Sequence, residues 1–266
     1  MSDELMSGAT PLAARLRALT PARVGLARTG VSQETHDLLD FQRCHAQARD
    51  AVHGRLEAAA LAAKLEEISG VEVLRLHSAA RDRATYLQRP DLGRVLDEDS
   101  RTRLGAYGDD EGFGNESRLA VVVADGLSAL AVERHAAAVL SELMPILRRD
   151  ETDGWRLTAV CVVEQGRVAI GDEIGLALQA QASIVLIGER PGLSSPDSLG
   201  AYITWQPRPG RTDAERNCIS NIRSDGLSYA QAASRLDYYL TEARRMQLTG
   251  VALKEQAVSL TEGDSA

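Results

Sequence analysis

A carboxylate and a guanidinium stand immediately after a buried segment in IVLIGERPGLSSPD, residues 184 to 197. The first four residues are predicted to form a strand, because an unalternating, β-branched apolar run is typical of a parallel strand covered by helices on both faces. A Pro-Gly pair then turns the chain away from the sheet. Ligands of open α/β sheets bind at the carboxyl ends of the strands, so Glu189 is expected to lie at a position where it could contact a ligand. An ordinary polar strand exit, with a solvated Glu189–Arg190 pair, is the alternative.

A second candidate is the DGLS sequence, Asp125 to Ser128, which follows the first regular strand. Either end of this sequence could cap the next helix, and ligand contact is the other interpretation. The Gly-x-Gly-x-x-Gly fingerprint of a dinucleotide site does not follow this strand, and the chain has no Gly-x-x-x-x-Gly-Lys-Ser/Thr phosphate loop. The sequence therefore does not predict a nucleotide site.

The spacing of the histidines and cysteines matches no metal-binding motif and no motif of a catalytic nucleophile. His45 and His53 could share one face of a helix, but no zinc-binding motif accompanies them. Cys44, Cys161 and Cys218 are far apart, which gives no Cys-x-x-Cys pair and indicates reduced thiols. No nucleophile–base–acid arrangement specifies hydrolysis.

The composition is that of a globular protein: 266 residues, 44% hydrophobic and 26% charged. The net charge of −8 and the aromatic content of 4% disfavour a nucleic-acid-binding surface. No stretch approaches the roughly 20 apolar residues of a membrane span, and the first residues lack the apolar core of a secretory signal. We therefore expect a cytoplasmic protein with no nucleic-acid or membrane partner.

Two regions differ in pattern. Residues 1–115 are predicted to be mainly helical, with Pro11 opening a helix, Ser32 capping a long helical stretch and Gly54 breaking it. Within this region VEVLRLH, residues 71–77, is compatible with a strand or a helix start.

In residues 116–266 strands alternate with helices. The strands are predicted at 119–125, 155–163, 183–189 and 201–206, and the last amphipathic helix at 227–248. This alternation predicts right-handed crossovers. The fold class is therefore α/β: a Rossmann-like, mainly parallel sheet flanked by helices and preceded by a small helical N-terminal region.

Several long strings resemble, in order, the small subunit of ethanolamine ammonia-lyase, and the likeness runs from about residue 21 to residue 233. They are ARVGLARTGVS, HAQARDAVH, YLQRPDLGRVL, VVVADGLSALAVERHA, GRVAIGDEIG, VLIGERPGLSSPDSLGAYITWQPRPGRTDAERNCISNIR and GLSYAQAA. The resemblance implies a subunit of an adenosylcobalamin-dependent carbon–nitrogen lyase, a radical enzyme of ethanolamine degradation. In that family a TIM-barrel large subunit holds ethanolamine and carries the catalytic residues, and the small subunit covers the opposite face of the corrin. This chain alone is therefore expected to be inactive. Whether the complex lies inside a protein-shelled bacterial microcompartment is left open by the sequence.

The resemblance implies three cofactor contacts in residues 116–266. They are Val168 in GRVAIGD, Glu189 in IGERPG and Cys218 in NCISN. Val168 opens the helix after the second strand, Glu189 offers a carboxylate acceptor, and Cys218 is small and polarizable. A buried core thiol is the alternative for Cys218.

The resemblance also implies that this chain does not ligate cobalt. Many cobalamin folds carry Asp-x-His-x-x-Gly, whose histidine replaces the lower base of the cofactor, and this chain has no such string. We therefore predict no metal ligand and expect the cofactor to keep its own base.

Residues 1–115 are expected to contact the large subunit. Arg23 and Arg28, and the turn from Arg89 to Arg94, interleave with glycine and proline and could donate to carboxylates of a partner. Solvated surface charge is the alternative. For the chain as a whole, the alternative function is a non-catalytic Rossmann-like binding or scaffolding module.

Overall fold

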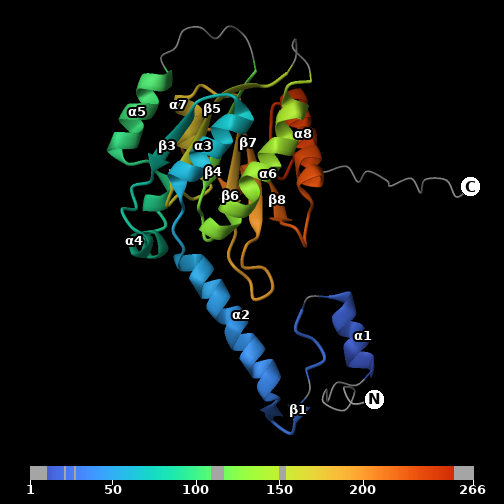
Figure 1. Cartoon of the computed structure of the whole chain (residues 1–266). Helices are drawn as coiled ribbons and strands as arrows, with labels where there is room; N and C mark the ends of the chain where they lie inside the picture. The colour runs from blue at the N-terminus through green and yellow to red at the C-terminus, as the bar shows by residue number, and fades with distance from the viewer. Residues whose placement is uncertain (1–10, 21, 27, 109–116, 150–153, 255–266) are drawn as a thin grey trace, which may run out of the picture.

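The computed structural model describes residues 11–20, 22–26, 28–108, 117–149 and 154–254 (Figure 1). In chain order, its helices and strands are α1 (Pro11–Leu19), β1 (Arg28–Thr29), β2 (Ser32–Gln33), α2 (Thr35–His53), α3 (Ala58–Ser69), β3 (Val73–His77), α4 (Arg83–Gln88), the 3-10 helix η1 (Leu92–Arg94), α5 (Glu98–Gly108), β4 (Arg118–Ala124), α6 (Ala129–Leu147), β5 (Arg156–Glu164), α7 (Ile170–Ala177), β6 (Ala182–Gly188), β7 (Leu199–Trp205), the 3-10 helix η2 (Asp213–Glu215), β8 (Arg216–Ile222) and α8 (Tyr229–Met246).

The body of the molecule is a six-stranded sheet in the order β3-β5-β4-β6-β7-β8. β3, β5, β4 and β6 pair in parallel. β7 is antiparallel to both β6 and β8, so it runs against the other strands of this sheet. The predicted α/β, mainly parallel sheet is confirmed, but the strand predicted at 201–206 is reversed and enters through a loop, without a crossover helix.

Helices cover the sheet in two layers. On one face α3, α6 and α8 pack on a large core to which β4 to β8 all contribute. On the other face α5 and α7 lie over β3, β5, β4 and β6 with a smaller core. The central strand β4 is buried along almost its whole length, which accounts for its unalternating apolar sequence.

Helix α7 approaches the sheet closely because it presents glycines to it. A Cβ atom at Gly171 would lie 2.4 Å from Cγ2 of Val185, and one at Gly175 would lie 2.4 Å from Cγ of Pro207. Both distances are far below van der Waals contact, so neither position accepts a side chain at this packing distance. The short helix therefore sits low on β6 and the chain that follows β7.

The sheet begins before residue 116. β3 is one of its two edge strands and lies in the segment 1–115, so Val73–His77 of the VEVLRLH sequence forms a strand. The sheet therefore extends across the predicted division. Gly54 does end α2, as predicted. The prediction that Ser32 caps this helix is wrong, because Ser32 belongs to β2 and the capping position is Glu34.

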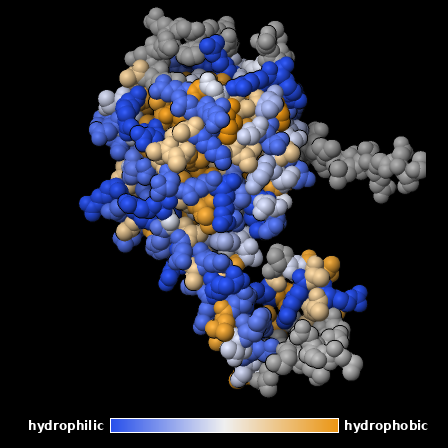
Figure 2. Space-filling view, viewed as in Figure 1, coloured by the Kyte–Doolittle hydropathy of each residue, from blue (hydrophilic) through white to orange (hydrophobic). Residues whose placement is uncertain are grey.

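Helix α2 extends away from the body and carries α1 and the β1–β2 hairpin at its far end (Figure 1). We call the described residues between 11 and 53 the arm. Its hydrophobic side chains include Leu19, Leu39 and Phe41, which are 83%, 58% and 41% exposed, and Figure 2 shows hydrophobic side chains at the surface of this part. Among the described helices, none is both long and apolar enough to cross a membrane.

Candidate functional site

The three predicted contacts come from separate elements. Val168 lies in the turn between β5 and α7, Glu189 directly follows β6, and Cys218 lies within β8. Val168 and Glu189 are half-buried, whereas Cys218 is exposed. The alternative that Cys218 is a buried core thiol is therefore wrong.

Strand register places Glu189 and Cys218 on the same face of the sheet. A Cβ atom at Gly200 would contact the Glu189 carboxylate, and Tyr202 projects to the same face two residues later. Tyr202 pairs directly with Cys218 on β8. Burial raises the pKa of Tyr202, and the neighbouring Cys218 thiol and Glu189 carboxylate act in the same direction.

Val168 belongs to the same face. Like Tyr202, it packs against the smaller core. The side chains of Cys218 and Ser220 alternate with the buried Ile219 and point to solvent. We call the surface formed by Val168, Glu189, Gly200, Tyr202 and Cys218 the open face.

The Glu189 carboxylate is anchored through one oxygen. Its Oε2 accepts hydrogen bonds from the hydroxyl of Ser198 and from the backbone N–H of Asn221, the latter at 3.2 Å. No donor within the described ranges is bonded to Oε1, which lies 3.0 Å from the position of a Cβ atom at Gly200. The protein thus orients the carboxylate and leaves one acceptor oxygen over the sheet.

Hydrogen bonds with buried side chains fix the turn that precedes Val168. The Asp125 carboxylate accepts from the N–H of Gly166 at 3.1 Å, and the Tyr86 hydroxyl donates to the carbonyl of the same glycine at 3.4 Å. Arg83 donates to the side chain of Gln165 at 3.3 Å. Gln165 has φ of 56°, a left-handed conformation that a non-glycine residue seldom adopts and that these contacts hold in place.

These groups fill the carboxyl edge of β4 and β5. Arg83 Nη1 donates to the carbonyl of Gly126 at 2.8 Å and lies 3.7 Å from Asp125, which is 1% exposed. Ser128 caps α6 by accepting from the N–H of Ala131 at 3.2 Å. The capping interpretation of DGLS is therefore confirmed for Ser128. The protein's own side chains occupy the carboxyl edge of the sheet at β4 and β5.

Burial raises the pKa of Asp125 to about 6. The backbone N–H groups of Gln165 and Gly166 and the Arg83 guanidinium favour the charged form and oppose this shift. Desolvation is the larger effect at this position.

A buried ion pair links α7 to β8. Arg216 donates from Nη1 to Asp172 Oδ1 at 2.7 Å and from Nη2 to Oδ2 at 2.6 Å, and the two side chains are 2% and 3% exposed. Nη1 also donates to the Thr204 hydroxyl on β7 at 2.9 Å, and Nη2 to the Arg211 carbonyl at 3.1 Å.

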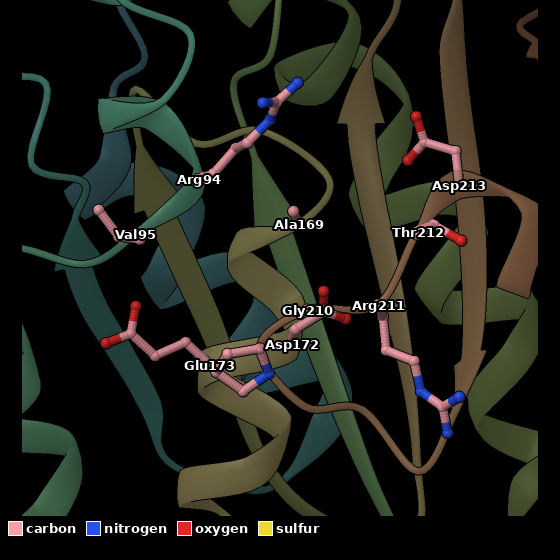
Figure 3. A pocket seen from close by; sticks show the side chains of 10 residues that line it. Arg94, Val95, Ala169, Asp172, Glu173, Gly210, Arg211, Thr212 and Asp213 are labelled. Carbon is pink, nitrogen blue, oxygen red and sulfur yellow. The ribbon is translucent and has the colours of Figure 1, made fainter.

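A cavity of about 440 Å³ lies beside this pair. Figure 3 shows its lining: Arg94 and Val95 on one side, the first turn of α7 in the middle and the segment 210–213 on the other. Asp172 and Ala169 both line it, so the cavity adjoins the α7 end of the open face.

The arrangement has the properties of a binding surface. It offers a free acceptor oxygen, an aromatic ring, an exposed thiol and the start of a helix, with no nucleophile paired to a base. In the described part of the chain no group of three or more His, Cys, Asp or Glu side chains could hold a metal ion.

Sequence reasoning missed Ser198, Gly200, Tyr202 and Asn221. These residues reach the site through the pairing of β6, β7 and β8, which is a long-range property. The one local signal was the predicted strand at 201–206, whose alternation assigns Tyr202 to the face opposite Ala201 and Ile203.

The basic segments also have internal roles. Arg23 donates to Asp40 Oδ2 and to the Asp37 carbonyl, each at 2.6 Å, and thereby ties the segment after α1 to α2. Arg89 forms a two-bond contact with Asp91. Arg28 and Arg94 are exposed.

Comparison with known proteins gives consistent matches. The sequence profile of the family described as "Ethanolamine ammonia-lyase light chain (EutC)" matches residues 11–254. A protein of Xanthomonas campestris pv. campestris (strain B100) named "Ethanolamine ammonia-lyase small subunit" is 58% identical over 244 residues, covering 92% of this chain and 88% of its own length. Proteins with the same name from Pseudomonas aeruginosa (strain UCBPP-PA14) and Pseudomonas syringae pv. tomato are 56% and 53% identical, over 94% and 100% of this chain and 90% and 93% of theirs. The chain therefore belongs to the ethanolamine ammonia-lyase light-chain family.

Proposed function

We propose that this chain is the small subunit of an adenosylcobalamin-dependent ethanolamine ammonia-lyase, and that its open face covers one side of the corrin. Family membership supports the role as a subunit of a carbon–nitrogen lyase. The observation that carries the cofactor assignment is the Glu189 carboxylate, which is oriented through Oε2 and whose Oε1, near Gly200, accepts no hydrogen bond from the described residues.

The residues present fit such a group. The corrin is a broad, flat ring whose edge carries amide side chains, so it needs hydrogen-bond acceptors at the edge and apolar contact across the plane. Glu189 Oε1 would accept from an amide N–H, while the Tyr202 ring and the Cys218 thiol would lie against the ring system. Val168 would add a further apolar contact. None of these groups carries a positive charge, which suits an amide-rimmed ligand.

The division of labour follows from this surface. When bound, the cofactor supplies the adenosyl radical that begins conversion of ethanolamine to acetaldehyde and ammonia. The side chains of this chain do not react: Glu189 orients the ring through its edge, and the half-buried Val168 and Tyr202 exclude water from the covered face. Catalytic residues are assigned to the partner.

The proposed partner is a TIM-barrel large subunit in a hetero-oligomer. The arm is the proposed contact region, because it extends from the body and exposes Leu19, Leu39 and Phe41. The complex is proposed to work in the cytoplasm, and fractionation would show whether a microcompartment encloses it.

The test is reconstitution with the large subunit, with cobalamin affinity and acetaldehyde release measured on the same preparation. Glu189→Gln keeps the side-chain shape but weakens the acceptor, so we expect cobalamin affinity to fall about tenfold, equivalent to about 1.4 kcal/mol. Glu142→Gln is the matched control, since Glu142 is exposed on α6. A complex that assembles without binding cobalamin would favour the scaffolding function, and wild-type affinity in Glu189→Gln would remove this carboxylate from the site.

A further inference from the structure

We propose that Asp172 and Arg216 are positioning residues, whose buried ion pair fixes the spacing between the two ends of the open face. The inference rests on the proposed function, because it concerns how Val168 and Cys218 are presented to one rigid ligand.

The pair has directional geometry. Two parallel N–H···O bonds of 2.7 and 2.6 Å join the guanidinium to both carboxylate oxygens. Such a fork fixes the relative orientation of the groups as well as their distance, which one lysine ammonium cannot do. Because both side chains are almost completely buried, water does not compete for these bonds.

The pair also extends across the strands of the sheet, from β8 over β7 to α7. Arg216 begins β8 and reaches across β7, where it donates to the Thr204 hydroxyl, before it meets Asp172 on α7. The guanidinium therefore joins an edge strand, its neighbour and a helix that lies over β4 and β6. Within the described ranges, the other contacts of α7 with β6 are those of Gly171 and of apolar side chains, which are not directional.

Each partner is coupled to one predicted contact. Asp172 lies in the first turn of α7, and Val168 lies in the turn that leads into this helix, where its carbonyl accepts from the N–H of Gly171 at 3.1 Å. A displacement of the start of α7 therefore moves both. Cys218 follows Arg216 by two positions on a strand, so the two side chains share a face. The ion pair thus joins α7, whose start follows Val168 directly, to the strand that carries Cys218.

A stabilising role alone does not explain the choice of residues. A buried ion pair contributes little net stability compared with a well-packed apolar pair of similar size. Fixed orientation is what this pair provides and an apolar contact does not. The adjoining cavity adds to this need, since α7 has an open flank towards segment 210–213 and lacks packing there.

The first arm of the test measures affinity in the complex reconstituted with the large subunit. Asp172→Glu keeps the charge but lengthens the side chain by one methylene group, and Arg216→Lys keeps the charge but loses the fork. We expect both to weaken cobalamin binding at least tenfold. Leu143→Ala is the matched control: it opens the core on the opposite face of the sheet, so it should lower the unfolding midpoint and leave the cobalamin Kd within twofold.

The second arm measures the spacing without ligand. Nitroxide labels are attached at Cys218 and at Val168→Cys in a Cys44→Ser background. Pulsed electron paramagnetic resonance then measures the distance between the turn that leads into α7 and strand β8. We expect a narrow distribution in the parent and a shifted or broadened one in Asp172→Glu and Arg216→Lys, but an unchanged one in Leu143→Ala.

The outcomes separate the two proposals. If the wild-type complex does not bind cobalamin, the proposed function fails, and the label distances still decide whether the pair sets the spacing. If the wild type binds and both ion-pair variants keep its Kd, the inference is wrong. It is equally wrong if Leu143→Ala weakens binding as much as they do.

Discussion

The buried Asp125 carboxylate gives a stability prediction with a definite sign. Asp125 is 1% exposed at the end of β4, and burial raises its pKa to about 6 from an ordinary value of 3.8. Below the ordinary value the carboxyl is protonated in both the folded and the unfolded chain. As the pH rises, the unfolded chain releases this proton first, so the folded state loses stability until the pH has passed about 6.

The size of this loss follows from the shift. A change of about two pKa units at about 1.4 kcal/mol each corresponds to about 3 kcal/mol in total. About 2.5 kcal/mol of this falls between pH 4 and pH 8, because the unfolded carboxyl is already partly ionised at pH 4. Asp125→Asn removes the titration and keeps an oxygen that can accept from the N–H of Gly166. We therefore expect the free energy of unfolding of Asp125→Asn, relative to wild type, to rise by about 2.5 kcal/mol between pH 4 and pH 8.

Urea unfolding of both proteins at a series of pH values measures the difference directly, because groups common to the two chains cancel. Asp99→Asn is the control, since Asp99 is exposed on α5. A difference for Asp125→Asn that is flat with pH, or that falls as the pH rises, would refute the reasoning. It would mean that Arg83 and the backbone N–H groups outweigh desolvation of the carboxylate.

Two further substitutions test the open face and the arm. In Gly200→Ala the new Cβ would lie 3.0 Å from Glu189 Oε1 and 3.2 Å from its Cγ, so the carboxylate should be displaced. Titration of the reconstituted complex should then show about tenfold weaker cobalamin binding. An unchanged Kd would place the ligand elsewhere. Arg28→Glu reverses an exposed charge at the far end of the arm and should reduce co-purification of the large subunit without lowering the unfolding midpoint of the isolated chain; full recovery of the complex would exclude Arg28 from the interface.

The central elements could be predicted because their sequences carry a local signal. β4 and β6 are buried along almost their whole length, so they appear as unbroken apolar runs, and α6 and α8 present one apolar stripe. Glu189 could be singled out for a related reason, since the abrupt end of a buried strand is visible in the sequence itself.

Elements with mixed burial could not be assigned in this way. β8 has the sequence RNCISNI and lies at the edge of the sheet, where several of its residues are exposed and two of its buried residues are polar, so its apolar content resembles that of a loop. β3 is also an edge strand and is only partly buried. The Asp172–Arg216 pair joins residues 44 positions apart, and its geometry depends on the reversal of β7, which no local pattern indicates.

That reversal also explains why the open face exists. Parallel neighbours need a crossover, and the crossover helix covers one face of the sheet. Antiparallel neighbours need only a loop, so β7 and β8 join the sheet without adding a helix to the face beneath α5 and α7. The helix that follows β8 packs on the other face, with α6. Cys218 and part of the half-buried Tyr202 are consequently left exposed at this end of the sheet. A flat ligand or a partner subunit can therefore approach the backbone of this sheet closely at β7 and β8, and Glu189 stands at the boundary where the covered part ends.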